Sequence, residues 1–257
     1  MRVCAALWAL RSALIVPLIK RVVRRGWTVA VGGFHHRSAQ QYEMLSARGT
    51  IARDFRRLYA AWENERSAGG MWQSADDQWF LGNVGLWTAF VEHVRDRTNL
   101  EIGAGPFGYL APCYWMKRRI VIDPLVDKYR AYQLKRFGKT FWTADIETHA
   151  VPAEQIVEPL RGAIDGCIVS RNALDHMEDP LAALETIAEY AACGCYLLLW
   201  TDIWHRDGGD VGHRNITRSA RVLDKTLDSL GFTIVQNGAG IHAAGGHIEY
   251  GRVARKR

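Results

Sequence analysis

The pattern of apolar positions changes near residue 98 of this 257-residue chain. Before that point, apolar residues recur at three- and four-residue spacing over 38–66 and over 79–97, which predicts long helices. After it, short apolar runs alternate with helical stretches. The runs predict strands at 99–102, 119–122, 140–143, 164–170, 195–201, 231–236 and 247–254, and the stretches predict helices at 108–116, 126–137, 153–161, 180–192 and 217–230.

Strand–helix alternation at this spacing is typical of a parallel, doubly wound sheet with right-handed crossovers. We therefore predict an α/β fold, with a Rossmann-like domain over 98–257 and an N-terminal helical extension over 1–97. The extension carries no recognisable chemistry, so we expect it to cover one side of the sheet or to close over a ligand. Ligands of such sheets bind beyond the carboxyl ends of the strands, where the strand order reverses.

Composition narrows the class of protein. Hydrophobic residues make up 48% of the chain and charged residues 23%, as in globular proteins. The net charge of +6 would suit a nucleic-acid partner, but much of the excess lies in 20–25 and 252–257, so we predict no such partner. Five scattered cysteines without a C-x-x-C pair favour reduced thiols and a cytoplasmic protein.

An apolar stretch at 3–19 precedes the basic cluster at 20–25. It is short for a membrane span, and Arg11 and Pro17 interrupt it. Three interpretations are open: a helix packed on the domain, an interfacial helix through which 3–25 makes peripheral contact with anionic lipid, and a membrane anchor. No clean cleavage site follows the stretch, which argues against secretion.

The first predicted strand ends in a glycine-rich turn, Glu101-Ile-Gly103-Ala104-Gly105-Pro-Phe-Gly108. Glycines at the carboxyl end of a strand let a ligand approach the backbone closely, and a helix that follows offers free N–H groups. The spacing alone is a weak signal, because many nucleotide sites and some structural turns share it.

Polar residues also follow the next three predicted strands. Asp123 and Pro124 follow the second, where an acid accepts hydrogen bonds from both hydroxyls of an adenosine ribose. Asp145 and Ile146 follow the third, where a carboxylate can accept the exocyclic amine of adenine. The fourth strand leads into 171–180. Each acid alone suits a helix cap, but matching residues at four successive strand ends favour a nucleotide-type ligand.

With these strand ends the sequence resembles the class I S-adenosylmethionine-dependent methyltransferases over about residues 98–236. The matching segments are the glycine turn, Asp123, 144–146, 172–180 and 227–232; Phe107 stands where the pattern most often has a third glycine. The resemblance implies a seven-stranded sheet, mostly parallel with an antiparallel last strand, and S-adenosylmethionine as cofactor. The cofactor-binding residues that it implies are Glu101, Gly103, Ala104, Gly105, Asp123, Pro124, Asp145, Ile146 and Asn172.

The resemblance also places a methyl acceptor beside the loop after the fifth strand. His213, with Asn215, lies in this loop and His176 in the loop after the fourth strand, and we predict both histidines as candidate catalytic bases. A hydrogen-bonded structural histidine is the alternative for His176. No metal ligand is assigned, although the density of His and Asp in 200–215 keeps a divalent metal ion as an alternative.

The nature of the acceptor follows mainly from what the chain lacks. We predict oxygen methylation of a small-molecule or glycan-like acceptor, or of a lipid-linked one if 3–25 contacts a membrane. No Asn-Pro-Pro-Tyr motif follows the fourth strand, which disfavours methylation of DNA amines. Two other functions stay open: an NAD(P)-dependent oxidoreductase or epimerase, disfavoured by the lack of a suitably placed Tyr-x-x-x-Lys pair, and a non-catalytic cofactor-binding scaffold.

Overall fold

The computed structural model describes residues 43–60, 80, 82–205, 213–238 and 247–257. Residues Tyr42–Arg257 form one compact unit. Residues 1–41, which contain the apolar stretch at 3–19 and the basic cluster at 20–25, lie outside the described residues. Within the described part of the chain, no helix is both long enough and apolar enough to cross a membrane.

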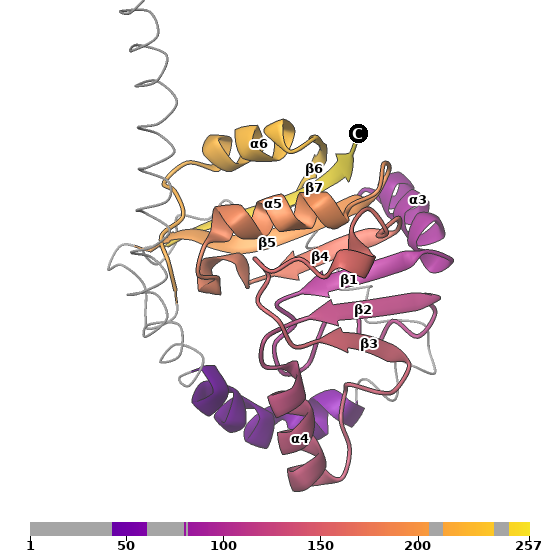
Figure 1. The fold of residues 1–257 in the computed structure, drawn as a ribbon, viewed down its shortest axis with the longest axis vertical. Coiled ribbons are helices and arrows are strands. Elements are labelled where there is room, and N and C mark those ends of the chain that lie inside the picture. Colours follow the sequence, from indigo (N-terminus) through magenta and orange to yellow (C-terminus); the bar gives the residue numbers. More distant parts are fainter. Residues whose placement is uncertain (1–42, 61–79, 81, 206–212, 239–246) are drawn as a thin grey trace, which may run out of the picture. The chain divides into compact units, whose positions relative to one another are not determined.

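The described strands form one seven-stranded sheet in the order β3-β2-β1-β4-β5-β7-β6, in which β7 runs antiparallel to both of its neighbours (Figure 1). The strands are β1 (Thr98–Ile102), β2 (Arg118–Ile122), β3 (Ile146–His149), β4 (Cys167–Arg171), β5 (Tyr196–His205), β6 (Phe232–Asn237) and β7 (His247–Lys256). This confirms the predicted α/β sheet with its antiparallel last strand. The strand order reverses between β1 and β4, which pair in parallel, so a ligand is expected beyond their carboxyl ends.

Neighbouring residues of the central strands pack on opposite faces of the sheet. Ile168 and Leu197 belong to the core cluster that also contains α5 (Pro180–Tyr190) and α6 (Ala220–Ser229). Val169 and Leu198 belong to the cluster that contains α3 (Val84–Arg95). A strand buried on both faces is apolar along its whole length, which is why the sequence revealed these strands.

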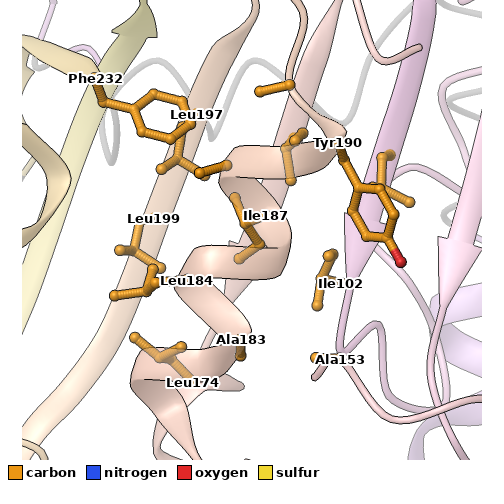
Figure 2. Packing of buried hydrophobic residues seen from close by; sticks show 14 of the residues in the cluster. Ile102, Ala153, Leu174, Ala183, Leu184, Ile187, Tyr190, Leu197, Leu199 and Phe232 are labelled. Carbon is orange, nitrogen blue, oxygen red and sulfur yellow. The ribbon is translucent and has the colours of Figure 1, made fainter. Parts of the chain in front are cut away.

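Helix α5 lies at the centre of the first of these clusters (Figure 2). Asp179 caps the helix by accepting hydrogen bonds from two backbone N–H groups of its first turn, and Pro180 occupies the first helical position, where no N–H is needed. In Figure 2, Leu184 of α5 lies beside Leu199 of β5. The cap therefore sets where α5 begins, and the buried residues define the face that it packs against the sheet.

Two predicted helices do not form as expected. Residues 108–116 make turns, because Gly108 has a left-handed backbone (φ 65°) and Pro112 does not fit inside a helix. Where a helix was predicted at 153–161, the structure has only a short 3-10 turn, η2 (Glu158–Leu160), with Pro159 near its start. The helix predicted at 126–137 is confirmed as α4 (Val126–Phe137).

The third strand lies at 146–149, and the prediction of 140–143 is wrong. Phe141 and Trp142 are both buried in one core cluster, whereas consecutive side chains of a strand point to opposite faces. The Gln133 side chain of α4 accepts hydrogen bonds from the Phe141 N–H and the Thr140 hydroxyl, in place of a neighbouring strand. The aromatic run fills a core instead of joining the sheet.

The helix at 43–60, indigo in Figure 1, belongs to the same compact unit as the sheet. Its Ile51 and Phe55 are buried in a core cluster with Val121 of β2 and Tyr129 of α4. This helix agrees with the central part of the one predicted at 38–66, whose two ends lie outside the described residues. The helix predicted at 79–97 corresponds to α3.

The turn after β1 approaches the chain beyond β4 very closely. Gly103 has a left-handed backbone (φ 71°), and a Cβ atom on it would lie 2.3 Å from the Cβ of Ala173. Gly138, at the end of α4, has nearly the same φ of 70°, but nothing lies within 4 Å of a Cβ placed there. Both positions favour glycine for its backbone, and Gly103 also needs it for space.

We expect Gly103→Ala to lower the free energy of unfolding by more than Gly138→Ala does. Each substitution costs about 1–2 kcal/mol for the left-handed backbone, and the added methyl at 103 costs about 1–3 kcal/mol more by forcing β1 and Ala173 apart. Urea unfolding of the two variants measures the difference. Equal losses in the two variants would contradict the close approach.

Candidate functional site

The carboxyl ends of β1, β2 and β4 lie together at one edge of the sheet, called here the carboxyl edge, because β1 pairs in parallel with both of the others. Three buried carboxylates, those of Glu101, Asp123 and Asp175, stand at or just beyond these ends. An ionised carboxylate is costly to bury unless hydrogen bonds compensate it. The partners of the three carboxylates therefore define the site.

Glu101 lies on β1 and holds the turn that follows it. Its Oε1 accepts a hydrogen bond from the Tyr109 N–H at 2.7 Å, and its Oε2 accepts one from the Leu110 N–H at 2.8 Å. Burial raises the pKa of Glu101 to about 7, although these two N–H groups act against the rise. A cation that bound nearby would favour the ionised form.

Asp123 ties the end of β2 to the glycine turn. Its Oδ2 accepts a hydrogen bond from the Gly105 N–H at 2.8 Å, and its Oδ1 accepts one from the Leu125 N–H at 2.7 Å. Burial raises the pKa of Asp123 to about 6, against the effect of these N–H groups and with a further contribution from the charge of Glu43. Gly105 has φ 61°, and nothing lies within 4 Å of a Cβ placed on it. Open space thus adjoins the half-buried backbone of Gly105, which the Asp123 carboxylate holds.

Three other residues predicted to bind the cofactor also lie at the carboxyl edge. The Ala104 carbonyl accepts the Gly108 N–H at 3.1 Å, which closes the turn, and half-buried Pro124 follows Asp123 directly. Asn172 has a left-handed backbone (φ 51°) just beyond β4. Asparagine tolerates this conformation better than most residues, and such backbone outliers cluster at functional sites.

Asp145 and Ile146 lie at the opposite edge of the sheet, so the reason for assigning them to adenine is wrong. Ile146 is the first residue of β3 and pairs with Arg119, near the start of β2. Asp145 forms an ion pair with Arg119 there. The last residue of β3 is His149, whose backbone carbonyl accepts the Asp123 N–H at 3.1 Å. The third strand end therefore brings His149, and not Asp145, to the carboxyl edge.

Three imidazoles surround one carboxylate oxygen beyond β4 and β5. The Asp175 Oδ2 atom lies 2.7 Å from Nδ1 of His213, 3.7 Å from Nε2 of His205 and 3.8 Å from Nε2 of His176. We call these four residues the histidine cluster. The Asp175 side chain is fully buried, whereas 18–25% of each histidine side chain is exposed. Each imidazole thus reaches the surface with part of its ring, whereas the carboxylate and Nε2 of His205 are buried.

Asp175 is fixed by groups on its other side. Its Oδ1 accepts a hydrogen bond from the Thr201 hydroxyl of β5 at 3.0 Å. Burial by itself raises the pKa of Asp175, but the hydrogen bond from His213 and the charges of His176 and His213 outweigh it and hold the pKa below its ordinary value. Asp175 is therefore ionised at neutral pH. It accepts the Nδ1–H of His213, which leaves Nε2 of that ring able to accept a proton.

His176 connects the cluster to the helix at 43–60. Its Nδ1 lies 3.2 Å from Oε1 of Glu43. Burial lowers the pKa of His176, but the interactions with Glu43 and Asp175 outweigh it, so the pKa lies above the ordinary value. Because the charge of Glu43 also raises the pKa of Asp123, this glutamate lies within electrostatic reach of both the glycine turn and the histidine cluster.

Asn215, predicted beside His213 in an acceptor site, supports the backbone of β5. Its Oδ1 accepts the His205 N–H at 2.5 Å, and its Nδ2 donates to the His205 carbonyl at 3.1 Å. These bonds hold the end of β5 and hence the His205 side chain. Asp207 and Asp210 of the same predicted loop lie outside the described residues.

Asp175, His205 and Glu43 were not assigned to the site from the sequence, although His205 lies in the His- and Asp-rich segment 200–215. Asp175 adjoins His176 in sequence, which hid its contact with His213 in another loop. Ligand atoms of Asp175, His205 and His213 all lie within 4.8 Å of one another, so among the described residues these three could hold a metal ion.

Glu101→Gln should weaken the pH dependence of stability in the ligand-free protein. Because the pKa of Glu101 is raised to about 7, the folded protein keeps a proton that the unfolded chain releases at a lower pH. This contribution is fully present below the unfolded pKa and is lost as the pH rises through about 7, at about 1.4 kcal/mol per pKa unit. Thermal unfolding from about pH 5 to about pH 8 should show a smaller fall in Tm for the variant. Parallel profiles would contradict this account of Glu101.

Comparison with known proteins shows a similarity of fold. No protein-family model and no curated protein matches the sequence. Among solved structures, that of the [4+2]-cyclase SpnF is 16% identical with a TM-score of 0.51, over 86% of this chain and 95% of that one. The trans-methyltransferase CalH, in complex with SAH, is 17% identical with a TM-score of 0.49, over 67% of this chain. The carbon methyltransferase CurJ is 17% identical with a TM-score of 0.47, over 63% of this chain.

The chain spans about half the length of two of these proteins, 55% for CalH and 49% for CurJ. At such identities the likeness concerns the fold, and a cyclase among the similar structures illustrates that a fold does not determine an activity. The sheet order with antiparallel β7 between β5 and β6 is nevertheless diagnostic of one architecture. By its sheet order, the chain has the Rossmann-like fold that class I S-adenosylmethionine-dependent methyltransferases share.

Proposed function

We propose that this chain is an S-adenosylmethionine-dependent methyltransferase that methylates an oxygen atom of a small-molecule or glycan-like acceptor. The observation that carries the proposal is the proximity, at one edge of the sheet, of a glycine turn held by two acids and a histidine paired with a buried carboxylate. The alternative of an NAD(P)-dependent enzyme is disfavoured, because dinucleotide-binding sheets have the order 3-2-1-4-5-6 without an inserted antiparallel strand.

The residues of the glycine turn suit S-adenosylmethionine. The open space beside Gly105 allows a ligand to lie against the backbone, and Asp123 borders that space with an oxygen that can accept from a ribose hydroxyl. Glu101 would favour the ammonium group of the methionine portion by its charge, since its oxygens are already bound by two backbone N–H groups. Gly103 would keep the turn close to Ala173 and so preserve the shape of the cradle.

When bound, S-adenosylmethionine supplies a methyl group on a sulfonium: the C–O bond to the acceptor forms as the C–S bond breaks, and S-adenosylhomocysteine leaves. In our proposal, Nε2 of His213 takes the proton that the acceptor hydroxyl loses. Asp175 fixes the tautomer of His213 through its Nδ1–H and stabilises the imidazolium that forms. A positioned base of this kind contributes about 10²–10⁴-fold to the rate.

His176 is the second candidate base in this proposal. Its raised pKa keeps more of it protonated near neutral pH than is usual for histidine, so we assign proton acceptance first to His213. The presence of candidate bases favours an oxygen acceptor, because an amine or a thiol can be methylated without a base. A lipid-linked acceptor, membrane contact through 3–25 and a cytoplasmic location stay predictions, since 3–25 lies outside the described residues.

The cofactor assignment is tested by binding of S-adenosylhomocysteine, measured by calorimetry. We expect Asp123→Ala and Gly105→Ala each to lower the affinity at least about 10-fold, because a lost hydrogen bond to a ribose or a blocked approach costs about 1.4 kcal/mol or more. Gly138→Ala is the matched control, since it imposes the same backbone strain with the same open space at the far end of α4. Wild-type affinity in both test variants would refute the assignment.

The catalytic assignment is tested by transfer of a labelled methyl group to a panel of hydroxylated small molecules and glycans. With an acceptor identified, His213→Ala should lower kcat about 10²–10⁴-fold and leave the affinity for S-adenosylhomocysteine unchanged. Raising the pH should restore part of the rate, because the acceptor then ionises without a base. Unchanged kcat in both His213→Ala and His176→Ala would remove the histidines from the mechanism. Binding of S-adenosylmethionine without transfer to any acceptor would favour the scaffold alternative.

A further inference from the structure

The histidine cluster contains more nitrogen ligands than one proton transfer needs. Three imidazoles point to a single oxygen of Asp175, and that oxygen can balance the charge of only one imidazolium. Asp202 adds a second carboxylate, with its Oδ2 3.9 Å from Nε2 of His205. Neutral imidazoles with a carboxylate in a partly exposed site form the donor set that binds divalent transition metals.

The distances suit an ion in the middle of three of these residues. Ligands placed about 2.1 Å from a tetrahedral Zn²⁺ are separated by about 3.4 Å from each other. The separations from Asp175 Oδ2 to His213 and His205, 2.7 Å and 3.7 Å, lie on either side of that value. All three ligand atoms lie within 4.8 Å of one another. Small side-chain movements would bring them to coordination distance.

We propose that Asp175, His205 and His213 form a binding site for a divalent transition-metal ion of the Zn²⁺ type. The three ligands come from η3 (Leu174–His176), the end of β5 and the segment that begins at His213. Mg²⁺ and Ca²⁺ fit poorly, because they prefer oxygen ligands, whereas two of these three ligands are imidazoles.

The groups around the ligands support this assignment. The Thr201 hydroxyl donates a hydrogen bond to Oδ1 of Asp175, and the Asn215 side chain bonds both the N–H and the carbonyl of His205. Partners of this kind orient metal ligands and reduce the cost of assembling a site. His176 lies next to the site: its Nδ1 is 3.2 Å from Oε1 of Glu43, and its Nε2 is 3.8 Å from Oδ2 of Asp175.

The role of such an ion rests on the proposed function. Three protein ligands leave a tetrahedral ion one position for water or for the acceptor oxygen. A hydroxyl bound there would ionise at a lower pH. The ion would then promote loss of the acceptor proton, a role that the His213 imidazole has in the metal-free protein. Nδ1 of His213 would instead bind the ion. The metal-loaded enzyme should therefore depend less on a base than the metal-free one.

The test uses the full chain, stripped with a chelator and titrated with Co²⁺, whose visible absorption reports tetrahedral coordination. We expect one Co²⁺ per chain with such a spectrum, displaced by Zn²⁺. His205→Gln and Asp175→Asn should each lower the Co²⁺ affinity at least about 100-fold, and Thr201→Val, which keeps all three ligands, about 10–100-fold. His93→Gln is the matched control, because His93 lies on α3 with its ring bonded to the Asp165 carbonyl, and its affinity should equal that of the wild type.

Equal Co²⁺ affinity in the wild type and His205→Gln, or no tetrahedral spectrum, would overturn the metal site. If Asp175→Asn fails to fold, His205→Gln alone still tests the metal site. The titration needs no S-adenosylmethionine, so the two proposals fail separately. A tetrahedral site in a chain that does not bind S-adenosylhomocysteine refutes the proposed function alone. Methyl transfer by a chain without the spectrum refutes the metal site alone.

Discussion

Burial of carboxylates at the carboxyl edge is the constraint on which the site depends. Glu101, Asp123 and Asp175 are withdrawn from water, so each has to be compensated by donors that the surrounding loops supply. Glu101 and Asp123 bind backbone N–H groups of the segments that follow β1 and β2. Asp175 binds an imidazole and a hydroxyl instead. The same interactions that satisfy the charges therefore also shape the glycine turn and orient His213.

These carboxylates differ in their state of protonation. Burial raises the pKa of Glu101 to about 7 and that of Asp123 to about 6. A charged ligand can therefore readily change the protonation state of both carboxyl groups near neutral pH. The pKa of Asp175 is lowered despite burial, because His213 supplies a hydrogen bond and His176 and His213 supply positive charge. A cationic cofactor would thus be favoured at one end of the edge and proton or metal binding at the other. Glu43 acts on both ends from the helix at 43–60.

Features that neighbouring residues determine could be predicted from the sequence, whereas features that depend on contacts between distant segments could not. Strands β4 and β5 could be found because they are apolar on both faces, and the glycine turn because Gly103 and Gly105 have left-handed backbones. The third strand was misplaced because Phe141 and Trp142 have the composition of a strand but fill a core. That error moved Asp145 to the wrong edge. The partnership of Asp175 with His213 joins two loops, and no local pattern encodes it.

The most direct test of the account is a crystal structure of the chain with S-adenosylhomocysteine. The account predicts the ribose against Asp123, the homocysteine along Gly103 and Gly105, and the sulfur facing an open space bordered by the histidine cluster. Binding at another edge of the sheet, or a sulfur turned away from His213 and His176, would contradict it.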